Sequence, residues 1–522
     1  MRAPTAFALV AAVLTVATGS DFRRTAAAET VLSVGIHTAQ LGTLDPHRTG
    51  STADVIVVPW LFNGLVRFKP GQLDLAAIEP DLATGWELSA DELTWTFKLR
   101  QGVKFNQGFG EMTSDDVVFS LLRAADAKIS AFASDYAGIA SAVAVDRYTV
   151  RVTLKAPNPN FLTVLMNYQG GTIVSRRAVE ELGEDYRIKA VGTGPFTVTG
   201  YQNGQMLNLA ANPDYFRGAP RIDRIVYRYL PSDSSRELAY RAGEIDVMFG
   251  PLNQRWTDRV SAIPDTIVDS IQPKALAQLH LNATHKPLDD IRVRQAVVHA
   301  VNRPELARFM GRGVAAEAVS VVPAGYIGID AKAPLPGHDI ARAKALLKEA
   351  GYENGVTIKA VHTANSTMLP PMEVVQAQLK RAGIDLQMTV VDHATFHAQI
   401  RKDLSDVVYY HAGGRFPSAD IFLTQFFHSA SAVGAPTAVV NFSHCNVADR
   451  EIEGARTERD AARQNALWKE AQRKIIEAAC AVPLFDVPLM WARRNSLDYG
   501  FAPVGALSLG HLITEQATLK AK

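Results

Sequence analysis

A turn near residue 410 gathers side chains that could bind a small molecule. Residues 409–417 read Tyr-Tyr-His-Ala-Gly-Gly-Arg-Phe-Pro, and they follow residues 406–408, which are typical of the end of a strand. Open α/β sheets bind ligands at the carboxyl ends of their strands, and arginine suits a carboxylate because its guanidinium donates two parallel hydrogen bonds. In the alternative interpretation Tyr409 and Phe416 are core residues and Arg415 pairs with a surface acid, but converging polar groups favour binding. The candidate ligand-binding residues of this turn are Tyr410, His411, Arg415 and Phe416.

Two other fragments have the residue types of metal sites. His393 and His397 lie four residues apart, so a helix would place both rings on one face. No third ligand is adjacent and Phe396 is the expected buried residue of that segment, so an exposed histidine pair without metal is the better interpretation. His444-Cys445 is an equally weak fragment. We therefore predict no metal site and no cofactor.

Local motifs of catalysis are missing from the sequence. The chain has no P-loop, no strand-linked G-x-G-x-x-G, no G-x-S-x-G elbow and no H-E-x-x-H helix. Residues 192–195, Gly-Thr-Gly-Pro, come nearest to a phosphate loop, but Pro195 removes a backbone donor and no lysine follows. We therefore expect no catalytic residues, although a triad assembled in space would leave no local pattern.

Composition excludes several classes of protein. The 522 residues, at 47% hydrophobic, are enough for about two to four packed domains. With 54 Lys+Arg against 53 Asp+Glu, the formal net charge of +1 gives no basic surface for nucleic acid or anionic lipid. Two cysteines cannot hold a chain of this length together, and Cys445 and Cys480 could either pair or remain buried thiols.

The first residues predict the compartment. Residues 1–28 are typical of an export signal, because Arg2 precedes the uncharged apolar run Ala6–Val16. That run is shorter than the roughly 20 residues that span a bilayer, and no later segment approaches this length, so we expect no membrane-embedded segment. Residues 26–28, three alanines, offer a cleavage site, with Gly19 as an alternative. No cysteine lies near position 20 to carry a lipid, so the prediction is a soluble periplasmic protein without a lipid anchor.

Strand-like and helix-like segments alternate along the chain, which favours an α/β architecture. A strand at 356–361, a helix at 372–382 and a strand at 384–391 form a βαβ unit, which implies parallel pairing. A long helix is expected from Glu451 to about Ala479, with Pro483 ending it. Other expected elements are a strand at 93–99, a helix capped at Thr113, a hairpin at 143–154 and a helix at 340–350 capped by Asp339.

Seven short segments, spread over more than 200 residues, resemble one known family. It is the family of solute-binding proteins that serve ATP-driven importers of oligopeptides, dipeptides and nickel complexes. Each segment alone is weak evidence, but all seven occur in the order of the family, behind an export signal. The segments are Leu44–His47, Leu82–Glu87, Thr96–Phe105, Gly192–Phe196, Asn212–Phe216, Gly243–Val247 and Val293–Arg303.

The resemblance implies a fold and its division. Members have a two-lobed α/β periplasmic-binding-protein fold, class II-like and of cluster C, with an extra α/β domain inserted in the first lobe. The chain crosses between the lobes twice, and Pro273 and Pro483 lie close to the crossings expected near 272 and 482, which suits hinge segments. The implied boundaries are 29–67, 190–272 and 482–522 for lobe one, 68–189 for the extra domain and 273–481 for lobe two.

The resemblance also implies site residues. Dipeptide-type members carry an Asp after the strand that ends near Val408, where it pairs with the peptide's α-ammonium; Arg415 corresponds here, and the later Asp of the motif is kept as Asp420. The reversed charge predicts a carboxylate-bearing solute, because an unpaired buried arginine would oppose an ammonium. Dipeptide-type members place an Arg for the peptide carboxylate where His362 and Asn365 stand. Further candidates at positions where members touch ligands are Tyr136 in the extra domain and Gln40 after the first strand.

The function implied by the resemblance is transport rather than catalysis. We expect a monomeric, periplasmic solute-binding component of an ABC importer, which delivers a small organic solute or short peptide to an inner-membrane permease. Two alternatives stay open. One is a nickel-type binder of metal chelates, in which His411 and Arg415 would hold the chelator's carboxylates. The other is a periplasmic hydrolase on the same fold.

Overall fold

The computed structural model describes residues 29–49, 51–72, 77–130, 132–166, 170–311, 313–365, 367–413, 416–434, 440–502 and 510–520. Within the helices and strands of these ranges, the side chains of Ser134, residues 272–274 and Ala394 are left out. The predicted export signal at residues 1–28 and the candidate Arg415 lie outside the described residues. In the part of the chain that is described, no helix is long and apolar enough to cross a membrane.

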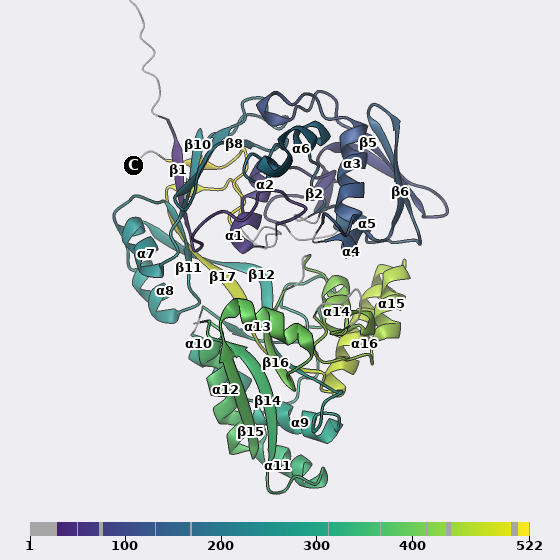
Figure 1. Ribbon diagram of the computed structural model, residues 1–522, viewed down its shortest axis with the longest axis vertical. Helices are drawn as coiled ribbons and strands as arrows, with labels where there is room; N and C mark the ends of the chain where they lie inside the picture. Colours follow the sequence, from purple (N-terminus) through teal and green to yellow (C-terminus); the bar gives the residue numbers. More distant parts are fainter. Residues whose placement is uncertain are drawn as a thin grey trace, which may run out of the picture.

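One long sheet runs through both lobes of the molecule. Figure 1 shows an upper lobe, which holds the elements from β1 to α8, and a lower lobe, which holds those from α9 to α16. Two long antiparallel strands, β12 (Thr266–Leu281) and β17 (Ala481–Arg494), join the lobes. Over the described ranges the sheet has nine strands in the order β16-β12-β17-β11-β1-β10-β9-β8, with β13 paired to β17. The shorter strands are β16 (Val407–Ala412), β11 (Val247–Gly250), β1 (Val31–Ile36), β10 (Arg224–Tyr229), β9 (Met206–Ala211), β8 (Phe196–Gln202) and β13 (Ala316–Glu317).

The upper lobe carries a second, antiparallel sheet in the order β4-β5-β7-β6. Strands β6 (Ile139–Asp146) and β7 (Thr149–Leu154) form the predicted hairpin, which is confirmed. The helix α3 (Ser114–Ala125) begins at the predicted cap, where the Thr113 N–H donates to an Asp116 carboxylate oxygen at 3.0 Å. The other helices and strands of this lobe are β2 (Val66–Phe68), β3 (Ile78–Pro80), β4 (Ala83–Leu88), β5 (Thr94–Leu99), β18 (Leu497–Asp498), β19 (Thr518–Leu519), α1 (Thr52–Val55), α2 (Val58–Leu61), α4 (Ala133–Tyr136), α5 (Phe161–Leu165), α6 (Arg176–Leu182), α7 (Asp233–Arg241) and α8 (Gln254–Ser261).

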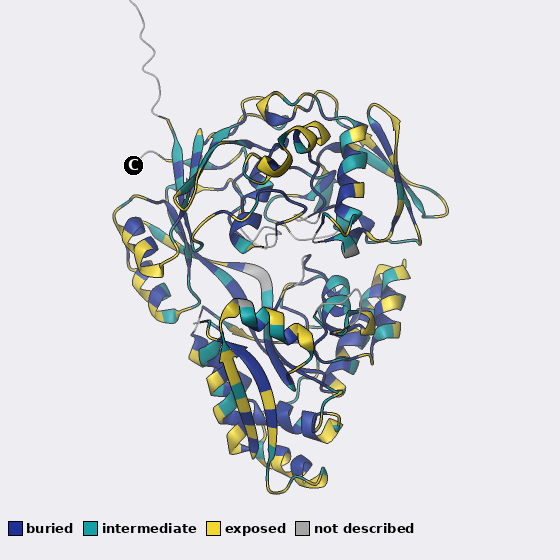
Figure 2. Cartoon of the chain, viewed as in Figure 1, coloured by how far each residue is buried: buried dark blue, intermediate teal, exposed yellow. Residues whose placement is uncertain are grey.

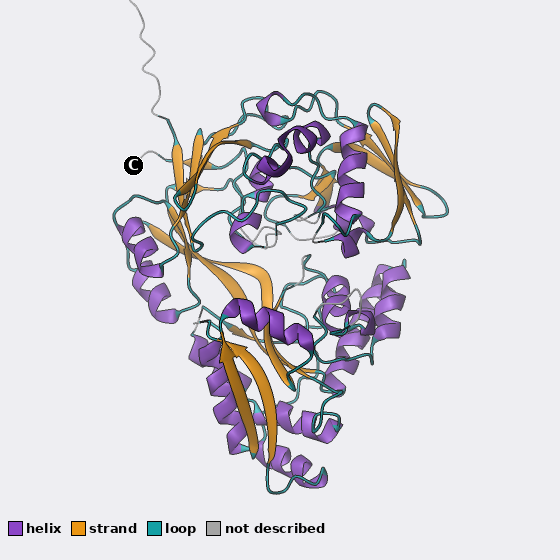
Figure 3. Ribbon diagram, in the orientation of Figure 1, coloured by secondary structure: helices purple, strands orange, loops and turns teal. Residues whose placement is uncertain are grey.

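The lower lobe contains the predicted βαβ unit. Strand β14 (Val356–Thr363), helix α12 (Leu369–Arg381) and strand β15 (Ile384–Val391) follow one another, and the two strands pair in parallel, which confirms the prediction. Helix α11 begins where expected, because the Asp339 side chain accepts a hydrogen bond from the Arg342 N–H at 2.9 Å. Figure 1 and Figure 3 show α14, α15 and α16 grouped on the side of the lower lobe away from this strand pair. The helices of the lower lobe besides α12 are α9 (Ile291–Ala300), α10 (Arg303–Met310), α11 (Ile340–Glu349), α13 (His393–Gln399), α14 (Ala419–Phe427), α15 (Asp449–Thr457) and α16 (Ala461–Glu477).

The predicted long helix from Glu451 to Ala479 is wrong. The chain forms two helices, α15 and α16, because the Asp460 side chain accepts a hydrogen bond from the Arg463 N–H and so starts a new helix. Pro483 does not end the helix either, since it lies inside β17. A register shift in the β12–β17 ladder occurs next to it, between the pairs of Ala277 and Gln278, where a residue without an N–H is tolerated.

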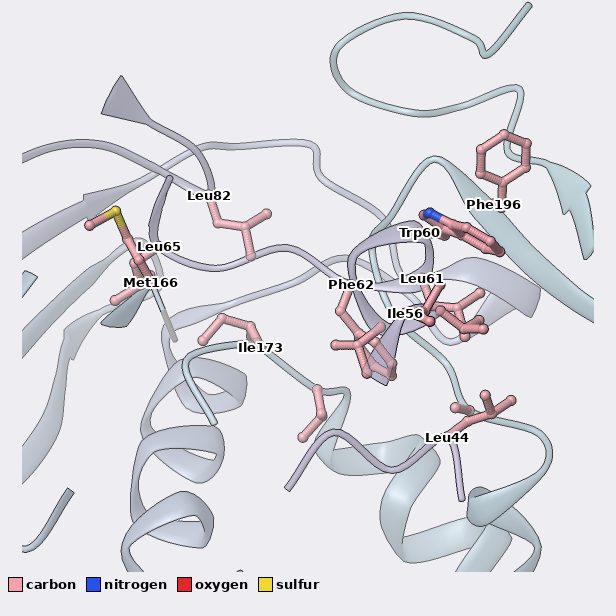
Figure 4. Close-up of a cluster of buried hydrophobic side chains, with 14 of the residues drawn as sticks. Leu44, Ile56, Trp60, Leu61, Phe62, Leu65, Leu82, Met166, Ile173 and Phe196 are labelled. Atoms are coloured by element: carbon pink, nitrogen blue, oxygen red, sulfur yellow. The ribbon is translucent and has the colours of Figure 1, made fainter. Parts of the chain in front are cut away.

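Each lobe has its own buried core. Figure 2 shows buried residues along the strands and the inner helix faces, with exposed residues on the outer faces of the lower lobe. Figure 4 shows part of the upper core, where side chains of α2, such as Trp60, meet Phe196 of β8. In the lower lobe Cys445 and Cys480 form a disulfide with Cα atoms 5.8 Å apart, which decides between the two open alternatives. It ties the segment before α15 to the segment after α16.

Candidate functional site

The turn that follows β16 brings the lower lobe into contact with the upper lobe. Phe416 is fully buried, and its ring lies 5.9 Å from that of Phe68 at the end of β2, measured between centroids. Phe416 belongs to the same buried cluster as the core of the upper lobe. Because burying a phenyl ring is strongly favourable, this contact helps to hold the lobes together.

A second contact between the lobes is ionic. Arg459, in the break between α15 and α16, lies with its Nε 2.9 Å from Oε2 of Glu92, in the turn between β4 and β5. Arg459 remains largely exposed, at 65% of its side-chain surface, so water screens the pair. The two contacts place α13, α14 and the end of β16 opposite the upper lobe (Figure 1).

Imidazole and phenol groups gather in the lower lobe at the carboxyl ends of β14 and β16. The Tyr409 hydroxyl lies 3.0 Å from His411 Nε2, and the rings of His362 and Tyr409 are 5.5 Å apart. On the adjacent helix α13, His393 Nε2 and His397 Nε2 are 3.2 Å apart. We call this group the imidazole cluster; its members are His362, His393, His397, Tyr409, Tyr410 and His411.

Burial favours the uncharged forms of His411, His362 and Tyr409 in the imidazole cluster. Burial lowers the pKa of His411 to about 4, with smaller contributions from the neighbouring His362 and His393. Burial likewise lowers the pKa of His362 and raises the pKa of the Tyr409 hydroxyl. Neutral imidazoles and phenols offer both donors and acceptors, so this face can bind polar solutes without imposing a charge.

The structure brings three of the predicted site residues together. His362, Tyr410 and His411 are all members of the imidazole cluster. His362 is fully buried, however, and its Nε2 bonds to the Met368 carbonyl at 3.2 Å, which makes it a support for the neighbouring rings. Asn365 shapes the backbone after β14, because its Oδ1 accepts hydrogen bonds from the N–H and hydroxyl of Thr367.

The other predicted residues lie in different surroundings. Tyr136 is fully buried in the upper lobe, where its hydroxyl donates to the Val164 carbonyl at 3.1 Å, whereas Gln40 is exposed. Asp420 lies in the first turn of α14 and 3.4 Å from the Nε of Arg456, so its carboxylate has a partner within the lower lobe. Across the described ranges no three His, Cys, Asp or Glu side chains are arranged to hold a metal ion.

A cavity of about 160 Å³ lies in the upper lobe, beside the Phe68–Phe416 contact. Phe68 is one of its lining residues, and its walls come from α2, β2 and the segment that follows Tyr499. Two of its polar lining residues, Asn63 and Asp81, bond to each other at 3.1 Å, and Asp81 also pairs with Arg217 at 2.9 Å. Most of the exposed surface that lines the cavity is apolar.

Asp486 is a candidate site residue that was not predicted from the sequence. It lies on β17, only 3% of its surface is exposed, and its carboxylate accepts a hydrogen bond from the Ala324 N–H at 3.1 Å. The available signal was a single acid within the apolar run 481–492. Its position follows from strand pairing, because Asp486 is paired with Leu276, which is also paired with the last residue of β16, Ala412.

Comparisons with known sequences place the chain among binding proteins. Residues 77–433 match the profile of the bacterial extracellular solute-binding proteins, family 5 Middle. Di/tripeptide-binding protein 2 of Pseudomonas aeruginosa (strain UCBPP-PA14) is 30% identical over 495 residues, which cover 88% of this chain and 91% of that protein. Glutathione-binding protein GsiB of Escherichia coli (strain K12) is 29% identical over 483 residues, which cover 90% of this chain and 91% of that protein.

Solved structures give a consistent result. The structure of MoaA from A. tumefaciens R10 in complex with mannopinic acid is 46% identical, with a TM-score of 0.85 over 95% of this chain and 100% of that one. The DppA protein of Helicobacter pylori in complex with the peptide STSA is 27% identical, with a TM-score of 0.79 over 94% of this chain and 98% of that one.

Proposed function

The chain belongs to the bacterial extracellular solute-binding proteins of family 5, and on that premise we propose that its solute is a small organic acid of the opine type. The family, the predicted fold class and the role as a solute-binding component of an ABC importer rather than an enzyme are confirmed. What remains to be proposed is the solute, the residues that bind it and the setting.

The observation that carries the choice of solute is the relative that was solved with mannopinic acid. At 46% identity over 95% of this chain, that protein shares more of the sequence than the di/tripeptide-binding relative at 30%. The imidazole cluster supports the same choice, since its members offer hydrogen-bond donors and none of them is an acid. A carboxylate seated there meets no like charge from the cluster.

We propose that the Nδ1–H of His411 donates a hydrogen bond to the solute carboxylate. Burial keeps the Tyr409 hydroxyl protonated, so it donates to His411 Nε2, which leaves the Nδ1 of His411 as the protonated nitrogen of that ring. The Nδ1–H can then donate to a solute oxygen. Arg415, four residues further along the chain, would supply the positive charge that the neutral rings lack.

The setting follows the family. We propose a periplasmic protein without a lipid anchor, which acts as a monomer and hands its solute to an inner-membrane permease. The proposed lobes are 29–67 with 190–272 and 482–522, and 273–481, with 68–189 as the extra domain. Phe416 would help to close the site, since its ring already contacts Phe68 of the upper lobe.

Calorimetry with purified protein tests the proposal. We expect mannopinic acid to bind more tightly than glutathione or the dipeptide Met-Leu, and Arg415→Ala to weaken mannopinic acid by about tenfold or more. Arg473→Ala is the matched control, because Arg473 is an exposed residue of α16 that pairs with Glu470. Native mass spectrometry of protein from its own periplasm checks the result independently. Tighter binding of the peptides, or full affinity in Arg415→Ala, contradicts the proposal.

A further inference from the structure

Asp486 is a buried carboxylate without a cationic partner among the described residues. Its neighbours in the sheet are Leu276 on β12 and Ala316 on β13, and the segment that covers it supplies only the Ala324 N–H. None of these offers a positive charge. Burial accordingly raises the pKa of the Asp486 carboxyl to about 6, with the hydrogen bond from Ala324 acting in the opposite direction.

Other acids of the chain show how unusual this is. The buried Asp45 meets Arg123 at 2.8 Å, the buried Asp81 meets Arg217 at 2.9 Å, and the partly buried Asp269 on β12 meets Arg493 at 2.7 Å. Asp54 has no such partner among the described residues, yet it accepts two backbone hydrogen bonds, from Gly42 and Thr43. Asp486 accepts one such bond, and a buried charge held so weakly is costly.

A second acceptor without a donor lies on the same face of the sheet. Gln278 is two residues from Leu276 along β12, so its side chain points to the face that carries Asp486. Its Nε2 donates to the Val321 carbonyl at 2.9 Å, which fixes the orientation of the amide. Its Oε1 is buried and accepts no hydrogen bond from any described residue. Val321 and Ala324 belong to one segment, so both acceptors lie beneath it.

That segment is connected to the turn after β16. The Ile327 N–H donates to the Pro417 carbonyl at 2.9 Å, and the Ala419 N–H donates to the Ile327 carbonyl at 2.8 Å. The residues around 321–327 therefore connect the two acceptors with the segment that carries Phe416 and Pro417. β16 itself ends at Ala412, in the same row of the sheet as Asp486 and two strands away.

We propose that Asp486 and the Oε1 of Gln278 together receive a protonated amine of the solute, so that the solute is an amino-acid conjugate with both a carboxylate and a cationic nitrogen. This rests on the proposed function and narrows its substrate class. A secondary ammonium has two N–H donors and one positive charge, which matches two acceptors of which one is a carboxylate. The carboxylate end of the solute then lies toward His411.

The test is Asp486→Asn, measured for both solute affinity and stability without solute. Asparagine keeps an acceptor for the Ala324 N–H and removes the charge, so the empty protein should unfold at a temperature about 2 °C higher at pH 7.5. The affinity for mannopinic acid, measured by calorimetry, should fall by about 30-fold or more. A merely structural aspartate would show lower stability, so a falling unfolding temperature or an unchanged affinity overturns the inference.

Two controls make the result specific. Asp54→Asn removes another buried carboxylate and should leave affinity within about twofold of the wild type, because Asp54 is bonded within the upper lobe. Gln278→Met keeps the side-chain length, removes the acceptor, and should weaken binding by about fivefold or more. Equal affinity in Gln278→Met and the wild type contradicts the assignment of Oε1.

The same variants separate this inference from the identity of the acid. If mannopinic acid does not bind the wild type, the proposed solute is wrong, and the dipeptide Met-Leu is compared with its N-acetylated form. A preference for the free amine that disappears in Asp486→Asn supports the inference. Equal binding of both forms, or of neither, overturns it.

Discussion

Two buried polar regions of the molecule differ in whether their polar groups bond to one another. In the upper lobe, Asp45 meets Arg123 at 2.8 Å, and the same guanidinium lies 2.9 Å from His47 Nδ1. On β12 and β17, the strands that join the lobes, the Asp486 carboxylate accepts one backbone hydrogen bond and the Gln278 Oε1 accepts none from the described residues. The polar groups of the first region bond to one another without a solute, whereas the acceptors of the second region would obtain further donors only from a bound solute. A network whose members bond to one another stabilises the fold, and a network with free acceptors can bind a solute.

The largest expected effect breaks the upper network. Arg123→Leu leaves Asp45 buried without its counter-charge, so we expect the free energy of unfolding to fall by about 3–5 kcal/mol. Solute affinity of the folded fraction should stay unchanged. Chemical denaturation and calorimetry measure the two quantities.

The control for this change is Arg177→Leu, which removes an exposed ion pair with Glu181 on α6 and should cost about 0.5 kcal/mol or less. If Arg123→Leu instead weakened binding while the stability stayed constant, the upper network would be part of the site, and the contrast between the regions would be wrong.

A second prediction asks whether every unpartnered group serves binding. His280 is fully buried among Phe426, Phe427 and Phe442, and neither ring nitrogen bonds to a described residue. Burial lowers its pKa from 6.5 to about 3. Since the unfolded chain binds this proton below pH 6.5 and the folded chain does not, stability falls as the pH drops through that range. His280→Phe should therefore gain about 2 kcal/mol at pH 5 and much less at pH 8.

Affinity decides the interpretation of His280. Three phenyl rings enclose it, so we expect His280→Phe to bind solute as the wild type does, in contrast to Asp486→Asn. Denaturation at pH 5 and pH 8, followed by calorimetry at pH 7, measures both. A loss of affinity would extend the recognition region into the core behind β12.

Local patterns predicted much of the fold, because they depend on neighbouring residues. The βαβ unit at β14–α12–β15 and the hairpin of β6 and β7 follow from periodicity and turn residues. The break between α15 and α16 was missed because apolar spacing continues on both sides, while a single cap at Asp460 starts the second helix. Pro483 was wrongly predicted to end a helix for a similar reason. Whether a proline ends a helix or lies at an irregularity between two strands depends on the strand that pairs with it.

The candidate site likewise contains residues that local sequence predicts and a residue that depends on remote strands. Tyr410 and His411 could be predicted because they end a strand, and strand ends collect ligands in this architecture. Asp486 could not, because its lack of a cationic partner is a property of β12, β13 and the segment around Ala324, which are remote in sequence. Its sequence context, an acid within an apolar run, is equally compatible with a structural ion pair such as that of Asp269 with Arg493.

The smallest expected effect concerns the ion pair between the lobes, which belongs to neither of the two buried polar regions. Arg459→Gln removes the pair with Glu92 while keeping a long polar side chain. Because Arg459 is 65% exposed, we expect solute affinity to fall by only about twofold at low salt, and by nothing measurable near 1 M salt, where the Debye length is about 3 Å. Glu92→Gln should have the same effect, and the double variant should be no weaker than either.

Arg342→Gln is the control. It removes an exposed ion pair with Glu349 on α11, and this pair lies within the lower lobe. An affinity loss in Arg459→Gln that rivals that of Asp486→Asn would mean that closure of the lobes, rather than the open acceptors of β17 and β12, sets the strength of binding. A loss that persists at high salt would point the same way, because a screened surface pair cannot produce it. The predicted order, with a large effect at Asp486 and a small, salt-sensitive one at Arg459, follows from burial alone: the same charge costs little to lose in water and much in the core.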